Sequence, residues 1–239
     1  MALDDIAALT FDVFGTVVDW RGSVIREGEA VGQRKQVTAD WGRFADAWRD
    51  LYQPAMEEVR SGRQPWTRLD DLHRASLDRL LPEFGLAGLD EAERVDLNNA
   101  WHRLDPWPDV VAGLTRLKRR FILATLSNGN IRLMVDMAKR AGLPWDAILG
   151  AEATKAYKPL PQAYLGTADL LCLPPERCLM VAAHYGDLLA AQSHGFRTCY
   201  VWRRAEFGSR PKNDLPAENH GLDLVVEDFD DLADRLGCA

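Results

Sequence analysis

The residues Ile6-Ala7-Ala8-Leu9-Thr10-Phe11-Asp12-Val13-Phe14-Gly15-Thr16 give the strongest single indication of the fold. The segment 6–11 is apolar almost throughout, which is typical of a strand buried on both faces. It runs directly into the carboxylate of Asp12 and then into Gly15 and Thr16. A strand of this kind belongs in a parallel sheet that helices cover on both sides, so the segment predicts an α/β core.

The chain beyond this segment repeats the pattern of strand followed by helix. Further strands are predicted at 121–126, 147–150, 178–182, 198–202 and 224–226. Helical spacing of apolar residues appears at 110–120, 131–141, 161–171 and 188–194, and Gly142 is a plausible helix cap. This alternation predicts an open parallel sheet of the α/β class.

A long stretch from about residue 20 to residue 101 interrupts the alternation and contains no convincing strand. Aromatic and aliphatic residues recur there at helical spacing, and Asp90 can cap a helix that runs to about His102. We therefore predict a core of residues 1–18 and 103–239 with a helical cap of residues 19–102. The many tryptophans of this cap are interpreted as helix-packing residues, and the polar stretch 210–221 as a surface loop.

The composition excludes several classes of function. The 239 residues carry a net charge of −7, which disfavours binding to nucleic acid or to an anionic membrane surface. No apolar run approaches the roughly 20 residues of a membrane-spanning helix. The four cysteines have neither zinc-site nor redox-motif spacing, and the amino-terminal residues do not resemble a signal peptide. We expect a cytoplasmic protein with reduced thiols.

Polar side chains follow four of the predicted strands at the point where each ends. They are Asp12 and Thr16, Ser127 and Asn128, Lys158, and His184 with Asp187. Ligand sites in parallel sheets gather at the carboxyl ends of the strands. The sequence thus predicts one site that contains a carboxylate, a hydroxyl group, a lysine and a second carboxylate.

These segments resemble the four motifs of the haloacid dehalogenase superfamily. Phe11-Asp12-Val13-Phe14-Gly15-Thr16 is similar to its first motif and Leu126-Ser127-Asn128-Gly129 to its second. Lys158-Pro159 is similar to the third motif and Gly186-Asp187 to the fourth. The motifs occur in the family's order over nearly the whole chain. The resemblance implies a Rossmann-like parallel core with a helical cap inserted after the first strand.

Phe14 distinguishes between the subfamilies. Phosphatases of this superfamily have a second aspartate at that position, which protonates the leaving group, whereas Phe14 can neither donate a proton nor bind Mg²⁺. Dehalogenases of the family resemble Asp-x-Tyr/Phe-Gly-Thr, with a Trp-Arg pair in the cap and a tyrosine six residues after the lysine. Trp48-Arg49 and Tyr164 match those features. We interpret the chain as a 2-haloacid dehalogenase that needs no metal or cofactor.

The resemblance also implies a role for each residue. Asp12 attacks the carbon that bears the halogen and forms an ester, and Lys158 keeps Asp12 ionised. Ser127 and the backbone N–H groups after Asp12, at Val13 and Phe14, bind the substrate carboxylate. Arg49 and Asn128 hold the departing halide, although Arg43 and Arg60 compete with Arg49 for this assignment. Thr16 orients Asp12, and Tyr164 supports Asp12 or Lys158.

The fourth motif departs from the family, because Ala182-Ala183-His184 stands where many of these dehalogenases have Ser-Ser-Asn. We hypothesise that His184 positions the hydrolytic water or lines the halide site, while Asp187 holds Lys158 or water. A purely structural His184 is the alternative. The predicted partner is a small halocarboxylate, and a homodimer is possible. A phosphatase or phosphonatase, or a catalytically silent binding protein, remains the alternative function.

Overall fold

The computed structural model describes residues 3–208 and 221–238. In that part, six strands form a parallel sheet in the order β5-β4-β1-β6-β7-β8. The α/β class with a parallel core is therefore confirmed. The strands are β1 (Ala8–Phe11), β4 (Ile122–Ser127), β5 (Ala147–Gly150), β6 (Cys178–Ala182), β7 (Arg197–Val201) and β8 (Leu224–Val226).

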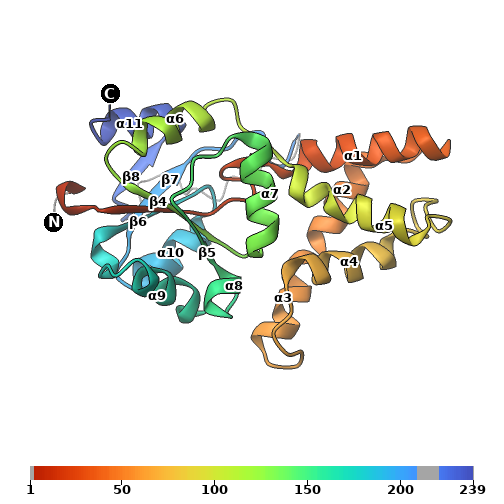
Figure 1. Cartoon of the computed structure of the whole chain (residues 1–239), viewed down its shortest axis with the longest axis horizontal. Coiled ribbons are helices and arrows are strands. Elements are labelled where there is room, and N and C mark those ends of the chain that lie inside the picture. Colours follow the sequence, from red (N-terminus) through yellow and green to blue (C-terminus); the bar gives the residue numbers. More distant parts are fainter. Residues whose placement is uncertain (1–2, 209–220, 239) are drawn as a thin grey trace.

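The central strand β1 is buried on both faces, and alternate side chains enter different hydrophobic clusters. Leu9 and Phe11 join the cluster formed with α6 (Val110–Leu117), α7 (Ile131–Ala141) and α11 (Phe229–Arg235). Ala8 joins the cluster formed with α9 (Pro161–Leu170) and α10 (Tyr185–Ser193). Figure 1 shows α6 and α11 on one side of the sheet and α9 and α10 on the other. This two-sided burial explains the continuous apolar sequence before Asp12.

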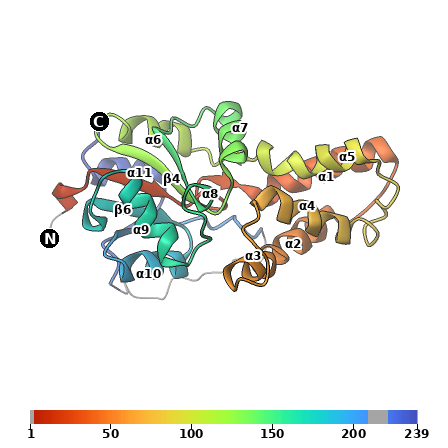
Figure 2. The same cartoon turned by 60° about the horizontal axis from the view of Figure 1, so that its bottom comes forward.

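A short antiparallel ladder marks where the chain leaves the sheet region and returns to it. β2 (Val18–Asp19) pairs with β3 (Asp105–Pro106). Between them lie α1 (Trp20–Lys35), α2 (Trp41–Asp50), α3 (Tyr52–Arg60), α4 (Leu69–Leu80), α5 (Glu91–Asn98) and the 3₁₀ helix η2 (Asn99–Arg103). These helices form a cap at the end of the molecule opposite the two termini (Figures 1 and 2). The helical cap after the first strand is confirmed, whereas the division at residues 18/19 and 102/103 stays a prediction.

Several predicted elements differ in detail from those observed. The helical spacing of the cap sequence between Trp41 and Arg60 is shared by two helices, α2 and α3, which are divided at Leu51. The helix predicted to start at Leu188 begins at Tyr185, which places Asp187 in its first turn. Asp90 caps α5 through a complete capping box, as predicted, but that helix ends at Asn98. The short elements η1 (Leu3–Asp5), α8 (Ala151–Thr154) and η3 (Pro175–Arg177) complete the described chain, and most of the predicted loop 210–221 lies outside it.

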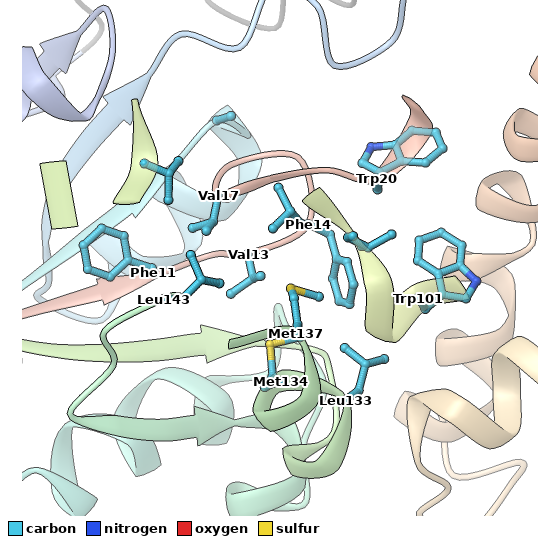
Figure 3. Close-up of a cluster of buried hydrophobic side chains, with 14 of the residues drawn as sticks. Phe11, Val13, Phe14, Val17, Trp20, Trp101, Leu133, Met134, Met137 and Leu143 are labelled. Carbon is cyan, nitrogen blue, oxygen red and sulfur yellow. The ribbon is translucent and has the colours of Figure 1, made fainter. Parts of the chain in front are cut away.

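The hydrophobic core continues from the sheet into the cap (Figure 3). The ring of Phe14, after β1, meets the ring of Trp101 edge-on at a centroid distance of 5.9 Å. Trp101 stacks on Trp20 at 6.3 Å and contacts Trp48 edge-on at 5.5 Å. All three tryptophans are at most 1% exposed, so they are packing residues as predicted. Their burial fixes the cap over the carboxyl end of β1. No helix among the described residues is long and apolar enough to cross a bilayer.

Candidate active site

A cavity of about 640 Å³ lies at the carboxyl ends of the strands, with walls from both the core and the cap. Eight of the predicted site residues line it, and the cap adds three residues that the sequence did not single out. The predicted residues are Asp12, Phe14, Arg49, Asn128, Lys158, Tyr164, His184 and Asp187; the additions are Asp50, Tyr52 and Gln53. The sequence therefore predicted most of the wall of this cavity.

Asp12 follows β1 and is 6% exposed, so its two oxygens are held almost entirely by protein groups. Lys158 Nζ donates to Asp12 Oδ1 at 2.9 Å. Thr16 Oγ1 donates to Asp12 Oδ2 at 2.8 Å and accepts from the backbone N–H of Ala183 at 2.9 Å. His184 Nδ1 lies 3.0 Å from the same Oδ2. The predicted role of Thr16 in orienting Asp12 agrees with these contacts.

Lys158 lies between two carboxylates, because its ammonium group also donates to Asp187. Tyr164 donates its phenolic proton to the other oxygen of Asp187 at 2.6 Å. Asp187 stands in the first turn of α10, where the helix dipole favours a negative charge. Tyr164 therefore orients Asp187, Asp187 orients Lys158, and Lys158 reaches Asp12.

Burial and charge act against each other on the pKa values of this group. Burial alone would raise the pKa of Asp12, but the charges and hydrogen bonds of Lys158 and His184 hold it well below its usual value. Burial would lower the pKa of Lys158, but Asp12 and Asp187 raise it above its usual value. The site consequently holds Asp12 as an ionised carboxylate that is almost fully buried.

His184 is fixed on its other side by a residue that the sequence analysis missed. Its Nε2 lies 2.9 Å and 3.1 Å from the two carboxylate oxygens of Glu206, which is 2% exposed. Trp20 Nε1 also donates to Glu206 Oε1, at 3.1 Å. Burial would lower the pKa of His184, but Glu206 and Asp12 together raise it to about 10. Glu206 follows β7, so the rule applied to the other strand ends would have found it.

Gly15 explains how Glu206 can approach the nucleophile. Gly15 has φ of +89°, a conformation that side chains rarely adopt. A Cβ atom on this residue would lie 2.1 Å from Glu206 Oε1. The glycine of the first motif thus provides both the turn after Asp12 and the space for the buried carboxylate beside it.

Arg49 is the arginine that the fold brings to the cavity. Its guanidinium lies over the ring of Tyr52 at 4.1 Å and over the ring of Trp20 at 5.3 Å. Its Nη1 is buried and has no hydrogen-bond partner among residues 3–208 and 221–238. The two competing arginines bind elsewhere: Arg43 pairs with Glu83 at the surface, and Arg60 donates to the backbone carbonyl of Lys158 at 2.8 Å.

Asn128 joins the cap to the core, since its Nδ2 donates to the hydroxyl of Tyr52 at 3.1 Å and its Oδ1 accepts from the backbone N–H of Lys158 at 2.8 Å. Three predicted residues do not line the cavity: Thr16, described above, and the two residues Ser127 and Val13. Ser127 is fully buried and accepts from the N–H of Gly129 at 3.1 Å. Val13 is a core residue without exposed surface. The proposed binding of the substrate carboxylate by these residues stays a prediction.

The comparisons with known proteins identify the family of the chain. Residues 6–195 match the model of the haloacid dehalogenase-like hydrolases. The chain belongs to this family. A curated relative, (S)-2-haloacid dehalogenase 1 from Pseudomonas sp. (strain CBS-3), is 30% identical over 224 residues, which cover 84% of this chain and 86% of the relative.

Among solved structures, this haloacid dehalogenase-like hydrolase is similar to the L-2-haloacid dehalogenase PA0810. The TM-score is 0.92 at 48% identity, over 97% of this chain and 98% of the other. It is also similar to the defluorinating L-2-haloacid dehalogenase Rha0230, with a TM-score of 0.93 at 44% identity, over 97% and 95% of the two chains.

Proposed function

We propose that this hydrolase converts small 2-haloalkanoic acids into 2-hydroxyalkanoic acids and halide, with Asp12 as the nucleophile. The observation that carries the proposal is the ionised carboxylate of Asp12 at the wall of the cavity, held by Lys158 and Thr16. Relatives that act on (S)-2-haloacids support this substrate class. A defluorinating relative adds fluoroacetate to the substrates worth testing.

In the first step, an oxygen of Asp12 attacks the carbon that bears the halogen. A new C–O bond forms, the C–halogen bond breaks, and the halogen leaves with the bonding electrons as halide. Arg49 has an unpartnered buried donor for the developing anion, and Asn128 also lines the cavity and contacts the same tyrosine, Tyr52. Lys158 stays protonated beside the new ester because Asp187 still compensates its charge.

In the second step, water attacks the acyl carbon of the Asp12 ester, and the bond from that carbon to the ester oxygen breaks. This oxygen leaves with the 2-hydroxyalkanoate and takes up one proton from the water, while the other proton passes to solvent as Asp12 returns to a carboxylate. Esterification removes the charge of Asp12, so His184 loses one of the two anions that raise its pKa to about 10. The pKa of His184 therefore falls, and the side chain can lose its proton and become neutral imidazole at a lower pH. Glu206 then stabilises the imidazolium that forms again when His184 accepts a proton. We assign to His184 the removal of a proton from the attacking water, with Glu206 as its orienting partner.

The phosphatase alternative is disfavoured by the position of Lys158. Its ammonium group lies between Asp12 and Asp187 and pairs with both carboxylates, whereas Mg²⁺ requires several oxygen ligands. A divalent cation there would face a fixed positive charge at hydrogen-bond distance from both carboxylates. The side chain of Phe14 offers no proton to a leaving group.

Halide release from chloroacetate, measured with and without EDTA, tests the proposal. Release that is insensitive to EDTA and abolished in Asp12→Asn supports it. Hydrolysis of p-nitrophenyl phosphate that depends on Mg²⁺ would favour the phosphatase, and no turnover of either compound would favour the silent binding protein. A cytoplasmic location and a homodimer stay predictions from the sequence, the latter open to measurement by light scattering.

A further inference from the structure

Two hydrogen bonds join the cap directly to the loop that follows β4. Asn130 Nδ2 donates to Asp70 Oδ2 at 2.8 Å, and the backbone N–H of Asp70 donates to Asn130 Oδ1 at 3.2 Å. Asp70 lies in the first turn of α4 in the cap, whereas Asn130 immediately precedes α7 in the core. The two residues are 60 positions apart in the chain. Both polar groups of the amide are therefore committed to the cap.

These hydrogen bonds are unusual for a residue at the position of Asn130, directly before a helix. Asparagine before a helix commonly accepts a hydrogen bond from the first turn of that helix. Asn130 has extended backbone dihedrals at the start of α7, yet its side chain makes no capping hydrogen bond. It is 2% exposed. Its side chain is thus used to connect the cap to the core instead of stabilising its own helix.

Charged neighbours hold Asp70 in place. His102 Nε2 lies 3.1 Å from Asp70 Oδ1, and His102 Nδ1 lies 3.0 Å from Asp136 Oδ2 on α7. Burial would lower the pKa of His102, but the hydrogen bonds and charges of Asp70 and Asp136 raise it above its usual value. The carbonyl of Asp70 also accepts from Asn98 Nδ2 at 3.1 Å. This network ties α4, η2 and α7 together.

The loop held by Asp70 carries a residue of the active site. Asn128 stands two positions before Asn130 and donates to the cap hydroxyl of Tyr52 at 3.1 Å. The loop 127–130 is consequently attached to the cap at two points. Asn128 bonds Tyr52, which lines the cavity, and Asn130 bonds Asp70, which does not. Any movement of Asn130 away from α4 would move Asn128 relative to both Tyr52 and Lys158.

We propose that Asp70 is a positioning residue for the reaction: by holding Asn130 it keeps Asn128 at the halide side of the cavity. The inference rests on the proposed function only for its kinetic consequence. Asp70 touches no reacting atom and does not line the cavity. Its effect should appear in ester formation, in which Asn128 faces the departing halide, and not in ester hydrolysis.

The test exchanges the two partners. Asn130→Asp places a carboxylate against Asp70 while keeping a good residue at the start of α7. Asp70→Asn leaves a single side-chain oxygen where the carboxylate had two, one facing Asn130 and the other facing His102. We expect each single variant to slow single-turnover halide release from chloroacetate about tenfold, since small misplacements of a contacting group are costly in an organised site. In the double variant the amide at position 70 can donate to the carboxylate at position 130. Its rate of halide release should therefore return to within about threefold of the original rate.

Asp71→Asn is the matched control, because Asp71 shares the first turn of α4 but is exposed and, within the described part of the chain, pairs with Arg68 alone. It should leave the rate unchanged. Hydrogen exchange gives a second readout that needs no turnover: the Asp70 amide and the amides of 128–131 should exchange faster in both single variants. A wild-type chain that releases no halide would refute the proposed function while leaving this readout intact. Unchanged halide release in both single variants, or no rescue in the double variant, would overturn the positioning role.

Discussion

The substitution Glu206→Gln removes the buried charge behind His184 and changes little else. The glutamine amide oxygen can replace Glu206 Oε1, the atom that accepts from Trp20 at 3.1 Å and lies 2.9 Å from His184 Nε2. The volume and both of these hydrogen bonds are retained. What is lost is the anion that stabilises a positively charged imidazole during ester hydrolysis.

The size of the effect follows from this geometry. A unit charge at about 4 Å contributes about 4 kcal/mol at an effective dielectric constant of about 20. The amide dipole of glutamine replaces part of that stabilisation, so we expect a loss of about 2 kcal/mol, which corresponds to a rate of ester hydrolysis about 30-fold slower. Ester formation does not require His184 to accept a proton and should change much less.

Rapid-quench measurement of halide and hydroxy acid separates the two steps. Glu206→Gln should release a burst of one halide per active site, followed by slow turnover, and mass spectrometry should find the ester on Asp12. His184→Asn should show the same burst, and Glu227→Gln, at an exposed site, should behave as wild type. Equal hydrolysis rates in Glu206→Gln and wild type, or a slow first step without ester accumulation, would refute the assignment of His184 and Glu206 to the second step.

Three further outcomes are expected. Arg49→Lys keeps the charge but loses the planar donors over Tyr52, so ester formation should fall about tenfold to hundredfold in single-turnover assays while ester hydrolysis is unchanged. Gly15→Ala should lower the free energy of unfolding by at least about 1–3 kcal/mol in urea titrations and slow ester hydrolysis, because the new Cβ meets Glu206 at 2.1 Å. The pKa of His184 is about 10 in the folded chain against an ordinary 6.5. Its protonation therefore contributes fully to the free energy of unfolding below pH 6.5, and this contribution is lost as the pH rises through about 10. Over this pH range, the midpoint of urea unfolding should fall less in Glu206→Gln than in wild type.

The site contains two cations, Lys158 and His184, and each lies between two carboxylates. On one side, Lys158 is shared by Asp12 and Asp187. On the other side, His184 is shared by Asp12 and Glu206. Asp12 is the carboxylate common to both pairs, so its esterification removes one anion from each cation. Lys158 keeps a partner that favours its charged form, whereas His184 has a much lower starting pKa and responds by releasing a proton more readily.

The sequence by itself determined the class of fold and predicted Asp12 as the nucleophile. The apolar segment that ends at Asp12 can be identified as a buried strand from its own residues alone. The polar residues that follow successive strands predict a site at one edge of the sheet. Phe14 also argued against phosphate chemistry without any structure, because its side chain has no polar atom. These conclusions rest on short segments of adjacent residues and on the order of those segments along the chain.

The tertiary structure decided which distant residues complete the site. Glu206 reaches His184 because the turn after β7 folds back over Gly15. Arg49 was separable from Arg43 and Arg60 only through its tertiary contacts, because Arg49 lines the cavity whereas the other two bind Glu83 and the backbone carbonyl of Lys158. Asp70 and Asn130 meet across 60 residues because aromatic packing around Trp101 fixes the cap on the core. Hydrophobic periodicity reports which face of an element is buried, but not which side chain of another element it will meet.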